Sequence, residues 1–236
     1  MKLTYIRWSM TIIETRGLTL VTDPVFRMLG LRQAPKVYTW ERLPRPDLVF
    51  VSHTHPDHFE PSTLKRLPAD TPVWMPAGQA GKAAGLGLRA LRGVQEWETE
   101  TVRGVKLTAV PAQHKGGELG LIVEGDRTVY FAGDTSLNRD LFRSLGQRWD
   151  LDAVLLPIGD LRSLGLSIGH IGPKKAIHAL RQLGEPHVVV PTHYSGMTLG
   201  PLMYFGGTPR KLGKALHKAE LGVIVGTTRP LETVEI

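Results

Sequence analysis

The stretch Leu48-Val-Phe-Val-Ser-His-Thr-His-Pro-Asp-His58 runs from an apolar strand pattern directly into a cluster of metal-ligand side chains. Residues two apart on an extended segment point to the same side, so His53 and His55 can both face one cation. A proline then turns the chain, and Asp57 and His58 can face a second cation. Histidine nitrogen and aspartate oxygen bind zinc and also manganese or iron. The string therefore predicts a metal site rather than a polar turn.

Three later segments, together with this string, resemble the signature of the metallo-β-lactamase-fold hydrolases. They follow in the order that the superfamily requires, and they read Pro111-Ala-Gln-His114, Phe131-Ala-Gly-Asp134-Thr and Pro191-Thr-His193-Tyr. The resemblance extends over nearly the whole chain. It implies an α/β fold, the αββα four-layer sandwich of the metallo-β-lactamase type, with the metal ligands on loops at one edge of the sheets.

Two further segments are similar to one branch of that superfamily, which holds N-acyl-phosphatidylethanolamine phospholipase D, ascorbate-6-phosphate lactonase and many uncharacterised bacterial hydrolases. They are Thr22-Asp23-Pro-Val-Phe26 and Gly169-His170-Ile-Gly-Pro-Lys-Lys-Ala176. The chain departs from the branch at Arg7-Trp-Ser9, where many relatives carry a Gly-His pair. It departs again at Lys115-Gly-Gly-Glu118, where arginine is more common. Both departures concern substrate recognition and leave the ligand set intact.

The resemblance implies a centre of two divalent metal ions and a metal-bound hydroxide as nucleophile. The implied ligands are His53, His55 and His114 for one ion, Asp57, His58 and His193 for the other, and Asp134 as a bridge between them. Zinc is the first expectation, and manganese or iron are the alternatives. The chain has no cysteine, so histidine and carboxylate must supply every ligand.

Three residues are expected to be catalytic, namely Asp57, Asp134 and His170. In the branch, the histidine before the proline-led helix contacts substrate phosphate or assists the leaving group, whereas the alternative for His170 is a loop histidine near a helix terminus. Asp23 is expected to accept a ring N–H from a ligand histidine and so fix its tautomer. The alternative for Asp23 is a turn residue before Pro24.

The composition fits one ordinary domain over residues 1–236, because 42% of the residues are hydrophobic and no flexible linker divides the chain. The start lacks an apolar signal core, and no run is long enough to cross a bilayer, so we expect a cytoplasmic enzyme. The formal net charge of +7 favours anionic partners. A small anionic substrate is favoured over nucleic acid, because no aromatic residues accompany the lysines of the helix predicted over 208–219. The oligomeric state stays open.

Short apolar runs separated by turn residues predict a strand-rich first half, and helices enter between the later strands. The predicted helices are Pro61–Leu67, Gln79–Ala84, Asn138–Leu145 and Pro173–Leu183. The segment Gln33–Pro46 lacks periodicity and is a candidate flap over the site. The favoured function is hydrolysis of a phosphodiester or similar small anionic ester. The alternatives are a lactonase of the ascorbate-6-phosphate type and a nucleic-acid-processing nuclease or nucleic-acid binder.

Overall fold

The computed structural model describes residues 1–28, 31–32, 38–194 and 202–236. The candidate flap lies partly outside these ranges, since residues 33–37 are not among them. In the described part, η1 (Trp40–Arg42) is a short 3-10 helix, and Tyr38 is buried with its ring stacked on Phe26.

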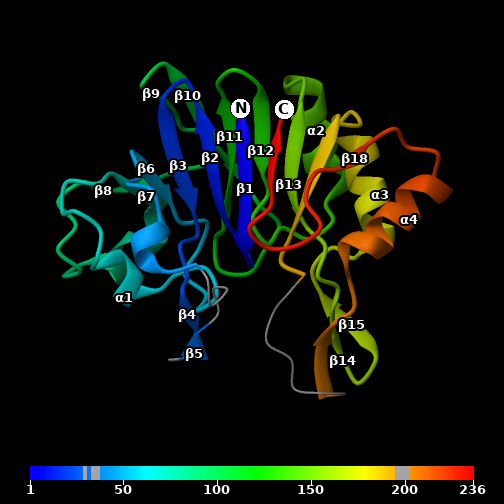
Figure 1. The fold of residues 1–236 in the computed structure, drawn as a ribbon, viewed down its shortest axis with the longest axis horizontal. Helices are drawn as coiled ribbons and strands as arrows, with labels where there is room; N and C mark the ends of the chain where they lie inside the picture. The colour runs from blue at the N-terminus through cyan, green and yellow to red at the C-terminus, as the bar shows by residue number, and fades with distance from the viewer. Residues whose placement is uncertain (29–30, 33–37, 195–201) are drawn as a thin grey trace.

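Two seven-stranded sheets pack face to face at the centre of the molecule (Figure 1). The first sheet has the order β19-β1-β2-β3-β6-β7-β8. Its strands are β1 (Lys2–Arg7), β2 (Met10–Thr15), β3 (Leu18–Thr22), β6 (Leu48–Phe50), β7 (Val73–Pro76), β8 (Leu91–Val94) and β19 (Thr233–Glu235). The strands from β19 to β3 pair antiparallel, and those from β3 to β8 pair parallel.

The second sheet repeats this plan, with the order β18-β16-β13-β12-β11-β10-β9. Its strands are β9 (Thr99–Val102), β10 (Val105–Pro111), β11 (Leu119–Glu124), β12 (Thr128–Phe131), β13 (Ala153–Pro157), β16 (Val188–Thr192) and β18 (Ile224–Val225). The strands from β9 to β12 pair antiparallel, and those from β12 to β18 pair parallel.

Helices cover the outer faces of both sheets and complete four layers (Figure 1). They are α1 (Pro61–Leu64), the 3-10 helix η2 (Ala77–Ala83), α2 (Arg139–Arg148), α3 (Pro173–Gln182) and α4 (Pro209–Lys218). The first two are shorter or tighter than the predicted helices over Pro61–Leu67 and Gln79–Ala84, and η2 contains two glycines, which have low helix propensity. The predicted αββα sandwich is confirmed.

Successive side chains of the inner strands point alternately into two hydrophobic cores. On β13, Ala153 and Leu155 point into the core between the sheets, whereas Val154 and Leu156 point into the core beneath α2, α3 and α4. Strands that are buried on both faces are continuously apolar for this reason. Among the described residues, no helix is long and apolar enough to cross a membrane.

Two small sheets lie outside the sandwich. One pairs β4 (Arg27–Met28) with β5 (Leu31–Arg32), and the other has the order β15-β14-β17, with β14 (Leu161–Ser163), β15 (Leu166–Gly169) and β17 (Met203–Phe205). Figure 1 shows β14 and β15 projecting from the sandwich below α3 and α4. The carboxyl ends of parallel strands meet at one edge of a sheet, and the candidate ligands follow the ends of β6, β12 and β16.

Candidate metal centre

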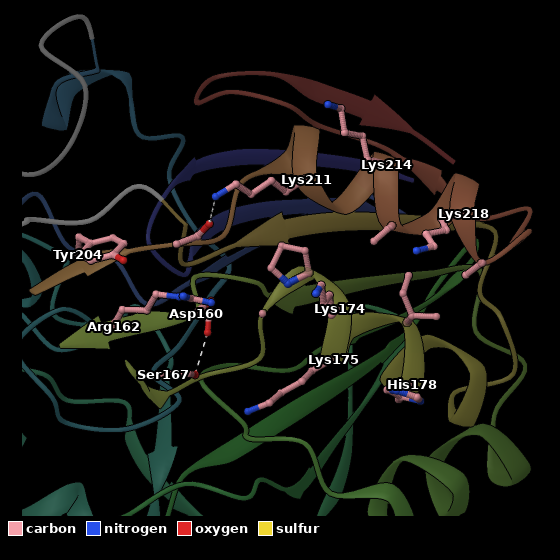
Figure 2. A pocket seen from close by; sticks show the side chains of 16 residues that line it. Asp160, Arg162, Ser167, Lys174, Lys175, His178, Tyr204, Lys211, Lys214 and Lys218 are labelled. Atoms are coloured by element: carbon pink, nitrogen blue, oxygen red, sulfur yellow. Dashed lines mark hydrogen bonds and ion pairs between the residues drawn. The ribbon is translucent and has the colours of Figure 1, made fainter. Parts of the chain in front are cut away.

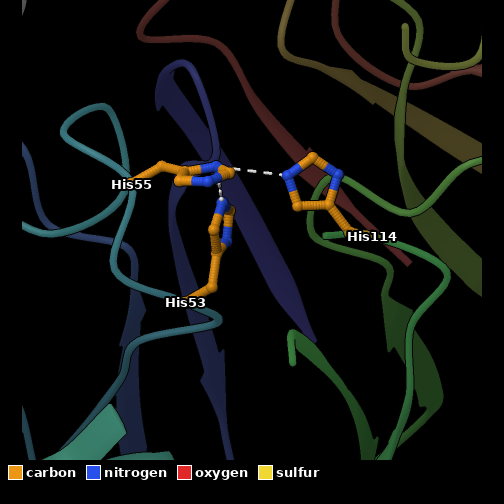
Figure 3. A group of neighbouring side chains, drawn as sticks. All are labelled: His53, His55 and His114. Carbon is orange, nitrogen blue, oxygen red and sulfur yellow. Dashed lines mark hydrogen bonds between the residues drawn. The ribbon is translucent and has the colours of Figure 1, made fainter. Parts of the chain in front are cut away.

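Three histidines predicted to hold one metal ion lie together. His53 and His55 come from the loop after β6, and His114 comes from the loop after β10. Nδ1 of His55 lies 2.8 Å from Nε2 of His53 and 3.2 Å from Nε2 of His114. Figure 3 shows the three rings grouped together, with the His55 ring joined to each of the other two. One ligand atom from each histidine falls within 4.8 Å of the others, which is close enough for a single cation to contact all three.

The second predicted set also lies together. Asp57, His58, Asp134 and His193 place one ligand atom each within 4.8 Å of the others. Nε2 of His193 lies 3.0 Å from Oδ2 of Asp57 and 3.2 Å from Oδ2 of Asp134, and Nε2 of His58 lies 3.2 Å from the same Asp134 oxygen. The rings of His53 and His58 are 4.1 Å apart between centroids, so the two sets are neighbours.

Asp134 was predicted to bridge two ions, and the structure groups it with the second set. Its Oδ2 contacts His58, His193 and His170, while its buried Oδ1 has no hydrogen-bond partner among the described residues. The bridging role stays a prediction.

His170 lies inside the centre rather than on a remote loop. Its Nε2 is 3.1 Å from Oδ2 of Asp134, and its ring lies 4.5 Å from that of His193. The residue has a φ of 61°, in the left-handed region, which is uncommon for a non-glycine residue. The small β15-β14-β17 sheet positions it, because His170 directly follows β15.

Asp23 contacts the side of His58 that faces away from Asp134. Its Oδ2 lies 2.7 Å from Nδ1 of His58, and it accepts hydrogen bonds from the Ser52 backbone N–H at 2.7 Å and the Ser52 hydroxyl at 2.8 Å. A carboxylate on Nδ1 leaves Nε2 of His58 turned toward the centre. The geometry is therefore the one that the predicted orienting role requires.

Glu118 is a buried carboxylate at the end of Lys115-Gly-Gly-Glu118, the second segment that departs from the branch. Its Oε1 accepts a hydrogen bond from the backbone N–H of Asp134 at 2.6 Å and lies 3.3 Å from Nδ1 of His53. A Cβ on Gly133 would lie 2.1 Å from this oxygen, so the approach requires glycine there. Burial and the charge of Asp134 raise the pKa of Glu118 well above its usual value. An ionisable side chain immediately before the apolar strand β11 was the available signal.

Gln79, at the start of the segment predicted as helix, connects the loops that carry the first set. Its Oε1 accepts hydrogen bonds from the backbone N–H and hydroxyl of Thr54 at 2.8 and 2.6 Å. Its Nε2 donates to the carbonyls of Gly116 and Gly117 at 2.7 and 2.9 Å. Because Thr54 lies between two candidate ligands and Gly116 follows His114, Gln79 holds the two loops in register. No sequence pattern identified this role.

Aromatic rings form one wall of the centre. Trp8 and Phe205 meet the His193 ring edge-on at 4.9 and 5.6 Å, and Phe205 stacks on His170 at 6.4 Å. The carbonyl of Trp8 accepts a hydrogen bond from the His193 backbone N–H at 2.8 Å. Trp8 belongs to the first departure from the branch, so that departure places an apolar ring where a polar pair is expected.

The pKa values of the histidines differ between the two ligand sets. Burial, reinforced by neighbouring histidines, lowers the pKa of His53 to about 3 and that of His114 to about 4, so these rings are neutral near pH 7, as metal ligands must be. Burial would lower the pKa of His58 as well, but Asp134, Asp57 and Asp23 raise it well above its usual value. Carboxylates therefore surround His58 and favour positive charge at the second set.

The residues present fit a divalent cation. Asp134 Oδ1 and His193 Nδ1 are buried without a hydrogen-bond partner among the described residues, and such atoms are costly unless something contacts them. The donors are imidazole nitrogens and carboxylate oxygens, which zinc, manganese and iron accept.

Fold and site together define a metal-dependent hydrolase of the metallo-β-lactamase type. The model of the β-lactamase superfamily domain matches residues 19–194, and the chain belongs to this superfamily. A metal-dependent hydrolase from Methanopyrus kandleri is 30% identical over the full length of both chains. A mitochondrial N-acyl-phosphatidylethanolamine-hydrolyzing phospholipase D from Saccharomyces cerevisiae is 27% identical over 83% of this chain and 48% of its own length.

The fold also matches the crystal structure of an isothiocyanate hydrolase from Delia radicum gut bacteria. The TM-score is 0.81 at 21% identity, covering 100% of this chain and 99% of that one. The match to the superfamily domain and to the Methanopyrus kandleri relative confirms the predicted superfamily and the prediction that the chain is a metal-dependent hydrolase.

Proposed function

We propose that this protein is a dinuclear metallohydrolase that cleaves a phosphodiester or a similar small anionic ester. The observation that carries this proposal is the adjacency of the two ligand sets, with His170 beside the second. The histidines of the first set would hold one ion, and the second set would hold the other. Two bound divalent ions, zinc in our expectation, would polarise the ester and lower the pKa of a water toward neutrality.

His170 is the residue that we assign to the leaving group. Burial opposes its protonation, but the hydrogen bond to Asp134 and the charge of that carboxylate raise the pKa of His170 above its usual value. A protonated imidazole can donate to a phosphate oxygen or to the departing alkoxide. The net charge of +7 favours capture of an anionic substrate, and the yeast relative is an N-acyl-phosphatidylethanolamine-hydrolyzing phospholipase D.

The test is a substrate screen of the metal-loaded protein against phosphodiesters, lactones, thioesters and a single-stranded oligonucleotide. We expect turnover of a small phosphodiester. Hydrolysis confined to lactones would support the alternative activity at the same centre, and hydrolysis confined to the oligonucleotide would make the protein a nuclease.

His170→Ala tests the assigned role within this screen. We expect the variant to keep its metal and to lose roughly 10²–10⁴-fold in kcat/KM, because a proton donor is removed and no ligand is. The matched control is His187→Ala, an exposed histidine before β16. Metal content, melting temperature and turnover are measured side by side. Loss of metal would make His170 a ligand, and unchanged turnover would remove it from the mechanism.

A further inference from the structure

A groove of about 970 Å³ lies between α3, α4 and the β15-β14-β17 sheet (Figure 2). It is separate from the metal centre. Tyr204 lines the groove, whereas the next residue on β17, Phe205, contacts His170 and His193 of the centre. Successive side chains of a strand point to opposite faces, so the small sheet divides the two spaces.

The groove is strongly basic. Lys174 and Lys175 line it from α3, and Lys211, Lys214 and Lys218 line it from α4. None of these lysines takes part in an ion pair with another described residue. Figure 2 shows Lys218 extending from α4 toward α3, while Lys175 and Lys214 extend outward from the rim.

Three of the five lysines occupy helix positions that their charge disfavours. Lys174 and Lys175 lie in the first turn of α3, and Lys211 lies in the first turn of α4, and neither first turn holds an acidic residue. Cations are unfavourable at a helix N-terminus, where the helix dipole is positive. An anion in the groove would remove this repulsion at both helices.

The carboxylate that lines the groove, Asp160, is already satisfied. It accepts hydrogen bonds from Nε of Arg162 at 2.7 Å and from the hydroxyl of Ser167 at 2.8 Å. It therefore neutralises Arg162. Nζ of Lys211 already donates to the carbonyl of Gly206 at 2.6 Å, so the lysines left available to a ligand are Lys174, Lys175, Lys214 and Lys218.

The floor of the groove is apolar. Ile177 from α3 and Ala215 and Ala219 from α4 line the groove together with the lysines. A polyanion such as nucleic acid would gain little from such a floor, whereas an alkyl chain would be removed from water there. The volume lies in the range of sites for single small molecules.

We propose that this groove binds a single-chain amphiphile with a phosphate headgroup. Lys174 and Lys218 would bind the phosphate, and the alkyl chain would lie on Ile177, Ala215 and Ala219. This site stands on observations independent of the metal centre, so it holds whatever ester that centre cleaves.

The test uses titration of the full-length, metal-loaded protein with a monoacyl glycerophosphate below its critical micelle concentration. We expect saturable binding that weakens at least about tenfold when Lys174→Glu is combined with Lys218→Gln, because two charge-assisted contacts are lost. Lys65→Glu with Arg89→Gln is the matched control, since it makes the same change in net charge at exposed positions away from the groove. The control should bind as the wild type does.

A second variant separates the headgroup from the chain. Ala215→Phe fills the apolar floor, so it should weaken the monoacyl glycerophosphate at least about tenfold. The uncharged monoacylglycerol should bind at least about tenfold more weakly than the phosphate compound to the wild type. Unchanged metal content and melting temperature show that each variant is folded.

Several outcomes would overturn the proposal. These are an absence of saturable binding, equal binding of the uncharged amphiphile, and loss of binding in the control variant. Tighter binding of a single-stranded oligonucleotide would make the groove a nucleic-acid site instead, and binding only to vesicles of phosphatidic acid would make it a membrane contact.

Discussion

At the scale of single residues, the candidate centre depends on carboxylates that contact its histidines from different sides. Asp134 meets the inward Nε2 atoms of His58 and His193, whereas Asp23 meets the outward Nδ1 of His58. Both carboxylates are buried, so burial alone does not distinguish them. Their positions do, because Asp134 lies on the side of the His58 ring that faces the other candidate ligands, whereas Asp23 lies on the opposite side.

Asp134→Ala should therefore lower activity more than Asp23→Ala. Loss of an orienting partner typically costs about 10–100-fold in metal affinity or activity, and loss of a ligand shared by the centre should cost more. Turnover is measured at saturating metal, with circular dichroism as the folding control. An equal or larger effect of Asp23→Ala in folded protein would reverse the two assignments.

The low pKa of His114 makes a prediction for the metal-free protein. Its pKa is about 4 in the folded chain, below the ordinary value of 6.5, so the unfolded chain binds more protons between those values. The stability contributed by neutral His114 is full above pH 6.5 and is lost as the pH falls toward 4. Urea unfolding of the wild type and His114→Asn across this range measures it. As the pH falls, the free energy of unfolding of the wild type should decrease relative to that of His114→Asn. If the two free energies depended on pH in the same way, the low pKa of His114 would be contradicted.

At the scale of elements, the helical layer over the second sheet is held by close backbone approach as well as by apolar faces. Gly146 of α2 lies against the end of α3, where an added Cβ would be 2.5 Å from the carbonyl oxygen of Gln182 and 2.7 Å from the carbonyl carbon of Leu183. Gly213 of α4 has nothing within 4 Å of such a Cβ. The two helical glycines therefore serve different purposes, although sequence alone does not separate them.

Gly146→Ala should destabilise the protein by about 1–3 kcal/mol, because overpacking outweighs the gain in helix propensity. Gly213→Ala is the matched control and should stabilise by about 1 kcal/mol, since alanine favours a helix over glycine where space is open. Chemical unfolding of both variants measures the pair. Stabilisation by Gly146→Ala would show that α2 does not pack this closely on α3.

At the scale of the whole molecule, the centre joins the two halves of the sandwich. The loop after β6 of the first sheet supplies the residues from His53 to His58, and strands of the second sheet lead to His114, Asp134 and His193. A bound cation in either set would therefore link one sheet to the other. Metal binding and global stability should be coupled for this reason.

Removal of metal by a chelator should lower the melting temperature by several degrees. A ligand present at 100 times its Kd stabilises a folded protein by about 2.7 kcal/mol, and a protein of this size shifts by about 2–4 °C per kcal/mol. Elemental analysis of the reconstituted protein should find about two metals per chain. Saturation at one metal that Asp57→Ala leaves unchanged would contradict the dinuclear proposal, and an unchanged melting temperature would contradict the link between the sheets.

The sequence by itself determined the superfamily, the four-layer architecture and the ligand candidates from His53 to His193. These features were readable because they are local strings, in which apolar strands end directly in side chains of one chemistry. The tertiary structure decided which groups support that set. Glu118 reaches Asp134, and Gln79 joins the loops of Thr54 and Gly116, through contacts between segments far apart in the chain.

The basic groove shows the same division. The sequence predicted a helix over 208–219 whose lysines have no aromatic residues among them, and it predicted Lys174 and Lys175 on a separate helix, Pro173–Leu183. Only packing of α3 beside α4 and the small sheet brought Lys174 and Lys218 into one groove with an apolar floor. Periodicity specifies which face of a helix is apolar, but the neighbour of that helix is set by the register and connections of the sheets, which only the folded chain determines.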